Sequence, residues 1–396
     1  MPSRIVVVGA GIAGLSTAVA LQRRGVDVTL VEERDDASSG AGISIWPNAL
    51  AALDEIGLGD AVRDAGGPVT AGAIRWRDGT WLRHAHPDRM VKALGEPLVV
   101  VRRATLTDIL DDALKPDTRR FNVAAAGVAE TAGGVRVDLA DGTAVDADAV
   151  VGADGTYSAI AAHLNGPLEQ RYTGYTAWRG VADATIDPSL AGETLGMGVE
   201  FGHVPMGPHH AYWFATERAA EGASAAEGEL TYLRKKYSSW ADPVPDMLAA
   251  TDPAALLRHD IYDRRAAKVW ARGPVVLVGD AAHAMRPHLG QGGCQGIEDA
   301  AILAALVDGA EDLASAFTRF AEFRQRRVKP LIRESVLIGR IVNLRPAVLS
   351  AAALRSTVLV PESLLTRHMA AVSSRDAFVM PAGDDLSGPR RSAAAR

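Results

Sequence analysis

Two glycine-rich segments, far apart in the chain, contain the residues best suited to bind a nucleotide. The first spans residues 9–14 and reads G-A-G-I-A-G, between a short β-branched run and a helical pattern. Gly9 allows a tight turn, Gly11 lets the backbone approach a pyrophosphate, and Gly14 lets a helix pack closely on a strand. Glu32 follows Gly11 by 21 residues, where a carboxylate accepts hydrogen bonds from ribose hydroxyls. Because a carboxylate there disfavours a 2′-phosphate, the pattern predicts bound FAD or NAD rather than NADP.

The second segment favours FAD over NAD. An apolar run at 275–278 predicts a strand whose end presents a carboxylate to a polyol. A glycine-rich turn then lays backbone N–H groups and a helix start against a flat ring, where they would stabilise negative charge on a reduced flavin. A plain nicotinamide dehydrogenase has no need of this second turn. The residues expected at the flavin are Asp280, Pro287, Gly290, Gly292 and Gly293.

Hydrophobic periodicity indicates the elements that position these segments. A helical pattern at 12–24 lies between two strand-like runs, and together they predict a βαβ unit that opens a doubly wound sheet. An Asp-Gly pair predicts a hairpin that joins strands at 135–139 and 149–151. Aromatic and β-branched residues at 172–181 and 211–216 indicate strands of a second sheet.

The composition excludes several classes of protein. Of 396 residues, 48% are apolar and 23% are charged, and the net charge of −6 comes without a basic stripe, so we expect no nucleic-acid partner. The single cysteine, Cys294, cannot form an internal disulfide, which indicates a reducing, cytoplasmic compartment. No apolar run is long enough to predict a membrane span. His283 and His288 lack partners at ligand spacing, so we expect no metal site.

Three motifs in order give the chain a family resemblance over about residues 4–340. They are the first glycine-rich segment with Glu32, the run Gly152-Ala153-Asp154-Gly155, and Gly279-Asp280 with its glycine-rich turn. In these motifs the chain resembles the single-component FAD-dependent aromatic hydroxylases, which are group A flavoprotein monooxygenases of the p-hydroxybenzoate hydroxylase fold. It is most similar in motif to the urate hydroxylase-like and zeaxanthin epoxidase-like members.

The resemblance implies a fold and its division along the chain. The fold is α/β, with a doubly wound, Rossmann-like FAD-binding domain of the glutathione reductase type, an inserted mixed β-sheet substrate domain and C-terminal helices. The divisions expected are 1–171 for the first part of the FAD-binding domain (with substrate-domain strands near 70–100), 172–268 for the substrate-binding sheet, 269–343 for the second part of the FAD-binding domain, 344–382 for C-terminal helices and 383–396 for a disordered tail.

The resemblance also implies cofactor roles beyond the two glycine-rich segments and Glu32. Arg103 matches an arginine beside the FAD pyrophosphate or ribityl chain, and Asp280 would bind the ribityl chain itself. Asp154 lies in a segment linked to both FAD and nicotinamide handling. Arg34 either stacks on the adenine or pairs with Glu32.

The implied reaction is hydroxylation of a small, electron-rich aromatic or heteroaromatic molecule. FAD would be bound non-covalently, NAD(P)H would be a transient electron donor, and O2 would be the co-substrate, trapped by reduced flavin as a C4a-hydroperoxide. The family commonly carries an arginine shortly after its Asp-Gly, but residues 158–162 contain none, which bears on nicotinamide handling. We expect a monomer or a homodimer.

The substrate pocket is expected between the flavin and the second sheet. The residues expected to line it are Ile45, Trp178, Met197, Phe201, Tyr212 and Pro287. The residues expected to act on the substrate are Tyr212, Arg179, His203 and His210, the histidines as bases for a phenol. Tyr212 falls where similar urate hydroxylases place a substrate-binding tyrosine, but Glu200 stands where they use an arginine. A carboxylate would repel a urate anion, which argues against urate itself.

Alternatives of the same fold and of other classes stay open at this stage. A flavin-dependent epoxidase and an antibiotic-modifying monooxygenase share the general plan. A non-catalytic binding or escort protein keeps the first glycine-rich segment but performs no redox step. A nicotinamide-only dehydrogenase would hold no flavin, so bound flavin separates the last two alternatives from the hydroxylase.

Overall fold

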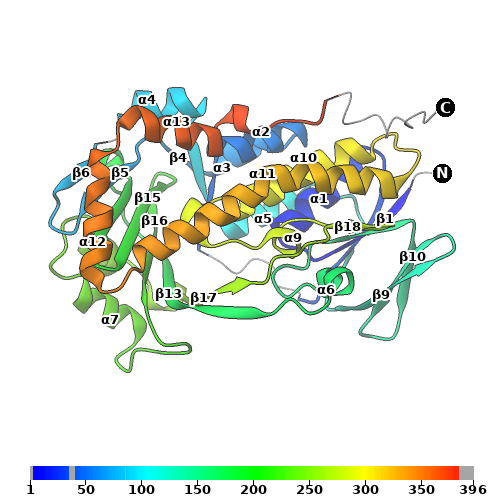
Figure 1. The fold of residues 1–396 in the computed structure, drawn as a ribbon, viewed down its shortest axis with the longest axis horizontal. Coiled ribbons are helices and arrows are strands. Elements are labelled where there is room, and N and C mark those ends of the chain that lie inside the picture. The colour runs from blue at the N-terminus through cyan, green and yellow to red at the C-terminus, as the bar shows by residue number, and fades with distance from the viewer. Residues whose placement is uncertain (1–2, 35–40, 85, 383–396) are drawn as a thin grey trace, which may run out of the picture.

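The computed structural model describes residues 3–34, 41–84 and 86–382, and the expected tail at 383–396 lies outside them. Within that part of the chain the strands form four sheets. Figure 1 shows an elongated molecule, with the N-terminal sheet toward one end and the largest sheet toward the other. One long helix, α11, crosses from the first region to the second (Figure 1).

The N-terminal sheet has six strands in the order β18-β19-β12-β1-β2-β8. Strands β2, β1, β12 and β19 are parallel neighbours, and their runs of valine, isoleucine and leucine are buried because helices cover the sheet. The βαβ unit expected from the sequence is confirmed as β1, α1 and β2. The bounds of the strands are β1 Arg4–Val8, β2 Asp27–Val31, β8 Arg119–Arg120, β12 Ala149–Gly152, β18 Ala271–Arg272 and β19 Val275–Leu277.

The hairpin at Asp141-Gly142 is present, but its second strand was predicted wrongly. β10 pairs antiparallel with Ala144–Ala147, and residues 149–152 instead form β12, parallel to β1. The chain thus turns back into the N-terminal sheet two residues after the hairpin. The bounds of this three-stranded sheet are β9 Ala125–Thr131, β10 Gly134–Leu139 and β11 Ala144–Ala147.

The largest sheet has seven strands in the order β17-β13-β16-β15-β14-β5-β6, and we call it the substrate sheet. Its bounds are β5 Ala73–Trp76, β6 Trp81–Arg83, β13 Gln170–Ala182, β14 Gly192–Gly196, β15 Val199–Met206, β16 His210–Arg218 and β17 Leu257–Arg264. The strands expected at 172–181 and 211–216 are β13 and β16. A small sheet of order β3-β7-β4 packs against it through contacts of β15 with β4 and β7. Its bounds are β3 Gly42–Ile45, β4 Gly67–Val69 and β7 Leu98–Arg102.

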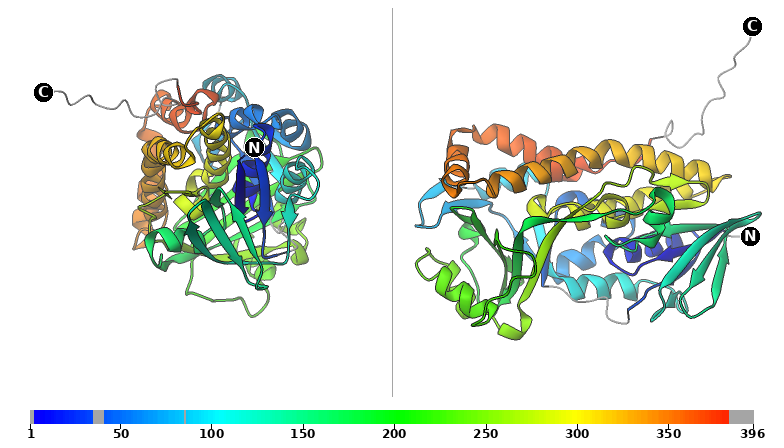
Figure 2. Two further views of the ribbon diagram at one scale, coloured as in Figure 1. Left: turned by 90° about the vertical axis from the view of Figure 1, so that its right-hand side faces the viewer. Right: turned by 60° about the horizontal axis from the view of Figure 1, so that its bottom comes forward.

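Helices cover the sheets and connect the two ends of the molecule. Their bounds are α1 Ile12–Arg23, α2 Pro47–Glu55, α3 Gly59–Ala65, α4 Pro87–Leu94, α5 Arg103–Asp112, α6 Ala159–Asn165, α7 Glu229–Lys236, α8 Val244–Ala249, α9 Asp280–His283, α10 Gly292–Val307, α11 Leu313–Val342, α12 Ala347–Ser356 and α13 Glu362–Ser373. At 30 residues, α11 is about 45 Å long at 1.5 Å per residue. Figure 2 shows it running the length of the molecule over both large sheets. No single described helix is long and apolar enough to cross a membrane; α11 passes only when joined to residues 347–359, at a bend of 119°.

One buried arginine ties three helices to the end of a strand. Arg324 on α11 donates from Nε to Asp299 Oδ1 and from Nη1 to Glu298 Oε2, both on α10 and both at 2.6 Å. Asp299 Oδ2 accepts from the backbone N of Gly279 at 2.8 Å and lies 2.6 Å from His283 Nε2 on α9. Burial opposes ionisation of Asp299, but His283 and Arg324 outweigh it and lower the pKa of this carboxyl to about 2.

Asp299→Asn should destabilise the protein by about 3–5 kcal/mol, because the variant removes one of the two carboxylates that pair with the buried Arg324 charge and breaks the buried network. Urea unfolding followed by circular dichroism measures the loss. The folded-state pKa lies below the ordinary value of 3.8, so wild type should lose this stabilisation as the pH falls from about 4 to about 2. The variant should show no such loss in that window.

Asp308→Asn is the matched control, since Asp308 pairs with Arg24 at 2.8 Å with both side chains more than a third exposed. It should cost at most about 1 kcal/mol. If the two variants lost the same free energy of unfolding, the buried network would contribute no more to stability than an exposed ion pair.

Candidate active site

The first glycine-rich segment joins β1 to α1, and its three glycines differ in what surrounds them. A Cβ on Gly9, whose φ is +102°, would lie 2.5 Å from the carbonyl oxygen of Ala153. One on Gly14 would lie 1.8 Å from the carbonyl oxygen of Gly9, whereas one on Gly11 would meet nothing within 4 Å. The first and third glycines are therefore required by packing within the protein, and the second faces open space that a ligand can use.

Glu32 holds the same segment from the end of β2. Its Oε2 accepts from the backbone N of Ala10 at 2.6 Å, and its Oε1 accepts from the backbone N of Arg34 at 3.1 Å. The Arg34 guanidinium lies 3.8 Å from Oε1, so of the two alternatives for Arg34 the structure shows the pairing with Glu32. A buried carboxylate beside the N–H groups that begin α1 suits a ribose next to a pyrophosphate.

The end of β19 brings Asp280 close to Arg103. Asp280 begins α9 with an exposed side chain, and a Cβ on Gly292, where α10 begins, would lie 4.0 Å from its Oδ1. Burial lowers the pKa of the Arg103 guanidinium, and the nearby Asp280 carboxylate opposes that effect. A carboxylate, a guanidinium and a helix start therefore lie together where the second glycine-rich turn begins.

Asp154 and Arg264 meet beside this strand end. Asp154 accepts from the backbone N of Ala159 at 2.8 Å, at the start of α6, and burial raises its pKa. Arg264, at the end of β17, donates from Nη2 to Ala281 O at 2.9 Å, while its Nε and Nη1 are buried without a partner among the described residues. Burial lowers the pKa of Arg264, and the carboxylates Asp280 and Asp154 oppose it. Sequence reasoning missed Arg264. It reaches the Asp154 segment from a distant strand, whereas residues 158–162, which directly follow that segment in sequence, contain no arginine.

The second glycine-rich turn follows the 3-10 helix Pro287–Leu289 and leads into α10. Gly290 has φ of +62°, and a Cβ there would lie 2.9 Å from Trp46 Nε1, which is buried without a hydrogen-bond partner in the described part of the chain. Cys294 Sγ lies 3.5 Å from Ser44 O, and burial raises the pKa of its thiol to about 12. This cysteine is therefore a packed, protonated thiol rather than a nucleophile.

These groups fit FAD. The starts of α1 and α10 present N–H groups that no side chain caps. Such groups suit the phosphates of FAD and the negative charge that develops on the ring of a reduced flavin. Carboxylates at two strand ends suit the hydroxyls of ribose and ribityl. Unpartnered donors on Arg264 and Trp46 leave hydrogen-bonding capacity at the site. When bound, the flavin supplies the redox chemistry, which no side chain of the chain can.

Gly11→Ala should keep the fold but weaken FAD binding at least tenfold, because its Cβ would enter the space that faces the ligand. Titration of the apoprotein with FAD, followed by flavin fluorescence, measures the affinity. The control is Gly14→Ala, whose Cβ collides with backbone and should lower the thermal midpoint as well. FAD affinity unchanged in Gly11→Ala would exclude this segment as the pyrophosphate site.

The substrate sheet has two faces, and the expected pocket residues divide between them. Successive side chains of a strand point to opposite faces. Trp178 on β13 and Phe201 on β15 pack with α7 and α8 in one buried cluster, and His203 shares their face. His203 Nε2 lies 3.0 Å from Thr194 Oγ1, and burial lowers its pKa to about 3. The structure therefore corrects the expectation for Trp178, Phe201 and His203, which belong to the core beneath these two helices.

Tyr212 and Arg179 lie on the opposite face, which we call the inner face because it is turned toward the β3-β7-β4 sheet. Tyr212 packs in a buried cluster with Val69 and Val100 of that sheet, and a Cβ on Gly42 would lie 2.6 Å from its ring. Arg179 lies close to Tyr212; burial raises the pKa of the phenol, and the Arg179 charge opposes it. These two expected residues are thus brought together by the fold.

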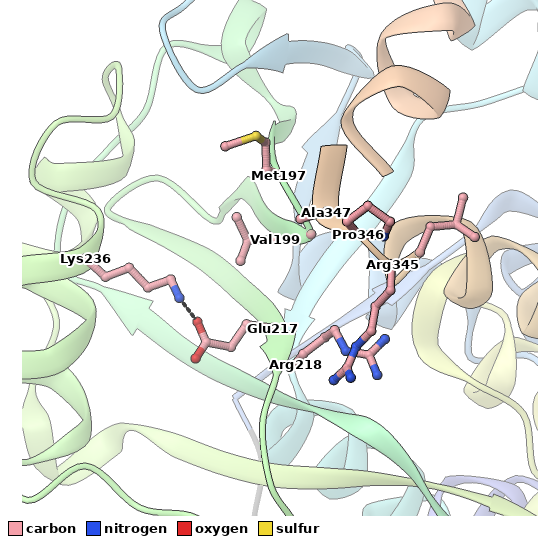
Figure 3. Close-up of a pocket in the computed structure, with 10 residues that line it drawn as sticks. Met197, Val199, Glu217, Arg218, Lys236, Arg345, Pro346 and Ala347 are labelled. Atoms are coloured by element: carbon pink, nitrogen blue, oxygen red, sulfur yellow. Dashed lines mark hydrogen bonds and ion pairs between the residues drawn. The ribbon is translucent and has the colours of Figure 1, made fainter. Parts of the chain in front are cut away.

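The other expected residues lie apart from this pair. Ile45 is buried in the core beneath the N-terminal sheet, and Pro287 is exposed at the turn. His210 begins β16 with 38% of its side chain exposed, 4.0 Å from Asp183 Oδ1. Met197 lines a cavity of about 600 Å³ at the outer end of the substrate sheet, beside the α11–α12 connection (Figure 3). The structure therefore places Ile45 and Met197 away from the expected pocket.

That outer cavity contains charged groups that serve the fold. Arg218 donates from Nη1 to the carbonyl oxygen of Asn343 at 2.6 Å, where α11 ends, and Lys236 pairs with Glu217 (Figure 3). None of its lining residues belongs to the glycine-rich segments. Among the described residues, no group of three or more His, Cys, Asp or Glu could hold a metal ion.

Sequence reasoning also missed a polar cluster on the inner face. Glu193 pairs in register with Gly202, and Leu195 with Glu200, so both glutamates share this face on neighbouring strands. His288 Nδ1 lies 3.4 Å from Glu200 Oε1. No motif marks these residues, and only the register of β14 against β15 brings them together.

Comparison with known proteins identifies relatives along nearly the whole chain. A family model described as FAD binding domain matches residues 3–312. The aurachin C monooxygenase/isomerase of Stigmatella aurantiaca is 36% identical over 340 residues, covering 85% of this chain and 89% of that protein. The FAD-dependent urate hydroxylase of Klebsiella pneumoniae is 33% identical over 338 residues, covering 83% and 88%. The chloroplastic zeaxanthin epoxidase of Solanum lycopersicum is 37% identical over 343 residues, covering 81% of this chain and 49% of the epoxidase.

Solved structures agree with these relatives. Klebsiella pneumoniae HpxO complexed with FAD and uric acid matches with a TM-score of 0.87 at 28% identity, covering 93% of this chain and 96% of that one. A salicylate hydroxylase substrate complex matches with a TM-score of 0.72 at 22% identity, covering 96% and 99%, which shows the shared fold.

Group A flavoprotein monooxygenases share this fold, and relatives of this identity and coverage place the chain among them. The chain belongs to the FAD binding domain family. It is an FAD-dependent oxidoreductase that uses NAD(P)H and O2, as the three sequence motifs predicted. The escort protein and the nicotinamide-only dehydrogenase are therefore no longer supported.

Proposed function

We propose that this monooxygenase hydroxylates a small, electron-rich aromatic or heteroaromatic ring held between the second glycine-rich turn and the inner face. The Tyr212–Arg179 pair carries the proposal, because it places a buried phenol and a half-buried cation together on that face. The pair would bind an oxygen substituent and orient the ring toward the flavin. A single, buried cysteine supports a reducing, cytoplasmic setting.

The proposal also assigns the cofactor residues. Gly11 and the start of α1 would hold the FAD pyrophosphate, with Gly9 and Gly14 shaping the loop, and Glu32 the adenosine ribose. Arg103, Asp280 and Arg264 would surround the ribityl chain. The residues proposed to line the flavin ring are Pro287, Gly290, Gly292 and Gly293. Asp154 supports this edge by accepting the first N–H groups of α6.

The test is NADH and NADPH oxidation by the FAD-loaded protein, with and without phenols, purines, hydroxyquinolines and polyketide aromatics. We expect at least one compound to stimulate oxidation and to gain one oxygen atom by mass. Stimulation by none of them with either donor would count against an aromatic substrate.

Epoxidation is the second candidate, favoured by the zeaxanthin epoxidase relatives. The same assay separates the two reactions, because a hydroxylated ring keeps its aromatic absorption whereas an epoxide opens to a diol in acid. If a polyene gained one oxygen atom and none of the aromatic compounds did, the result would favour the epoxidase.

Tyr212→Phe should raise the substrate dissociation constant about tenfold, because one buried hydrogen bond to the substrate is lost. The change in flavin absorbance on substrate addition measures binding, and the 450 nm absorbance checks that FAD is retained. Tyr172→Phe is the control, since its hydroxyl donates to Ala219 O at 2.9 Å outside the inner face. Identical substrate affinity in wild type and Tyr212→Phe would remove Tyr212 from the site.

A further inference from the structure

Glu200 is a buried carboxylate fixed on the inner face. It is 5% exposed, and its Oε1 accepts from Thr216 Oγ1 at 2.9 Å and lies 3.4 Å from His288 Nδ1. Since His288 directly follows Pro287, Glu200 is tied to the second glycine-rich turn. The carboxylate therefore sits where the substrate sheet meets the flavin side of the molecule.

His288 connects Glu200 to a second polar group. Its Nε2 lies 2.9 Å from the hydroxyl of Tyr175, which also lies on the inner face. Burial raises the pKa of Tyr175, so this phenol keeps its proton and can donate it to Nε2. When Tyr175 donates to Nε2, the other ring nitrogen of His288, Nδ1, faces Glu200 Oε1 at 3.4 Å. Among the described residues no arginine or lysine forms an ion pair with Glu200, whose carboxylate contacts His288 and Thr216 instead.

Glu193 lies next to Glu200 and has no such support. Its side chain is partly accessible, and among the described residues no group donates a hydrogen bond to it. Burial, and then the charge of Glu200, raise the pKa of Glu193 to about 8. At neutral pH this carboxyl therefore holds a proton and can both donate and accept.

A row of residues across the sheet links Glu193 to the Tyr212–Arg179 pair. Register places Arg179, Phe214, Gly202 and Glu193 side by side on β13, β16, β15 and β14. A Cβ on Gly202 would lie 2.1 Å from the Phe214 ring, so that ring lies over Gly202 and forms the middle of the row. Three strand spacings, about 14 Å, separate the ends of the row. The row therefore has a cation at one end, an aromatic ring in the middle and a carboxyl at the other end.

We propose that Glu193 and Glu200 bind the N–H or O–H donors of an uncharged or protonated nitrogen-bearing aromatic substrate and select against aromatic anions. The substrate ring would lie against the Phe214 ring, with an oxygen substituent toward Arg179 and its donor toward the glutamates. A carboxylate on the ring's donor side would meet Glu200 at close range in a low-dielectric site and be repelled. This inference rests on the proposed aromatic hydroxylase function and names the chemical class of its substrate.

The test compares two ligands that share one ring system, 4-hydroxyquinoline and its 2-carboxylate, binding to the FAD-loaded protein without NAD(P)H. Dissociation constants come from the change in flavin absorbance. Wild type should bind the uncharged compound at least tenfold more tightly than the anion. Glu200→Gln and Glu193→Gln combined should reduce that preference about tenfold or more, mainly by weakening the uncharged ligand and admitting the anion.

Glu217→Gln is the matched control, since Glu217 lies on the same sheet with its carboxylate paired to Lys236 on the opposite face. It should leave the preference unchanged. A wild type that prefers the anion, or a double variant with the wild-type preference, would overturn the inference while the hydroxylase function stands. If neither ligand perturbs the flavin, and no aromatic stimulates NAD(P)H oxidation in any variant with full FAD content, the proposed function itself fails and this inference with it.

Discussion

The buried charge of Arg324 constrains the rest of the structure. Its guanidinium is 1% exposed and would be costly to bury alone, so Asp299, Glu298 and Gln295 must stay within hydrogen-bond distance. Asp299 in turn holds the backbone N of Gly279. The position of Asp280 at the strand end and the direction in which α10 begins are therefore set by one ion network. These two features cannot shift independently, which suits the binding of a cofactor with a rigid ring.

The same helix that carries Arg324 connects this network to the substrate sheet. Further along α11, a Cβ on Gly339 would lie 2.6 Å from His288 Nε2, so the helix can approach the turn only because this residue is glycine. His288 then contacts Glu200 and Tyr175 on the inner face. The long helix thus packs against His288, which in turn forms polar contacts with the substrate sheet. A substitution at one end of α11 should therefore affect the position of residues at its other end through packed atoms rather than through flexible loops.

How much the sequence could predict depends on the range of the interactions involved. The positions of the first glycine-rich segment, Glu32 and Asp280 at the ends of strands were predicted, because they follow from neighbours a few residues away and from a carboxylate at a fixed spacing. The hairpin after β10 shows where this stops. The Asp-Gly pair located its turn correctly, but the second strand was placed wrongly. Residues 149–152 pair in parallel with β1 and β19 instead, and these strands are far away in sequence. Arg264 was missed for the same reason, since it reaches the Asp154 edge from β17.

The substrate side was harder to predict because a single residue of register decides which face a side chain joins. Phe201 and Glu200 are adjacent in sequence, yet one packs beneath α7 and α8 while the other contacts His288. Phosphates are bound by backbone N–H groups whose positions glycines reveal, whereas a small ring is bound by side chains drawn from several antiparallel strands. Such strands accept many kinds of residue on either face, so the composition of a strand does not reveal which side chains point toward the substrate. The side chain at position 200 contacts Thr216 and His288 and is far in sequence from the first glycine-rich segment and Glu32. Its charge can therefore differ without any change in the glycine-rich motifs, which is why those motifs do not report the substrate.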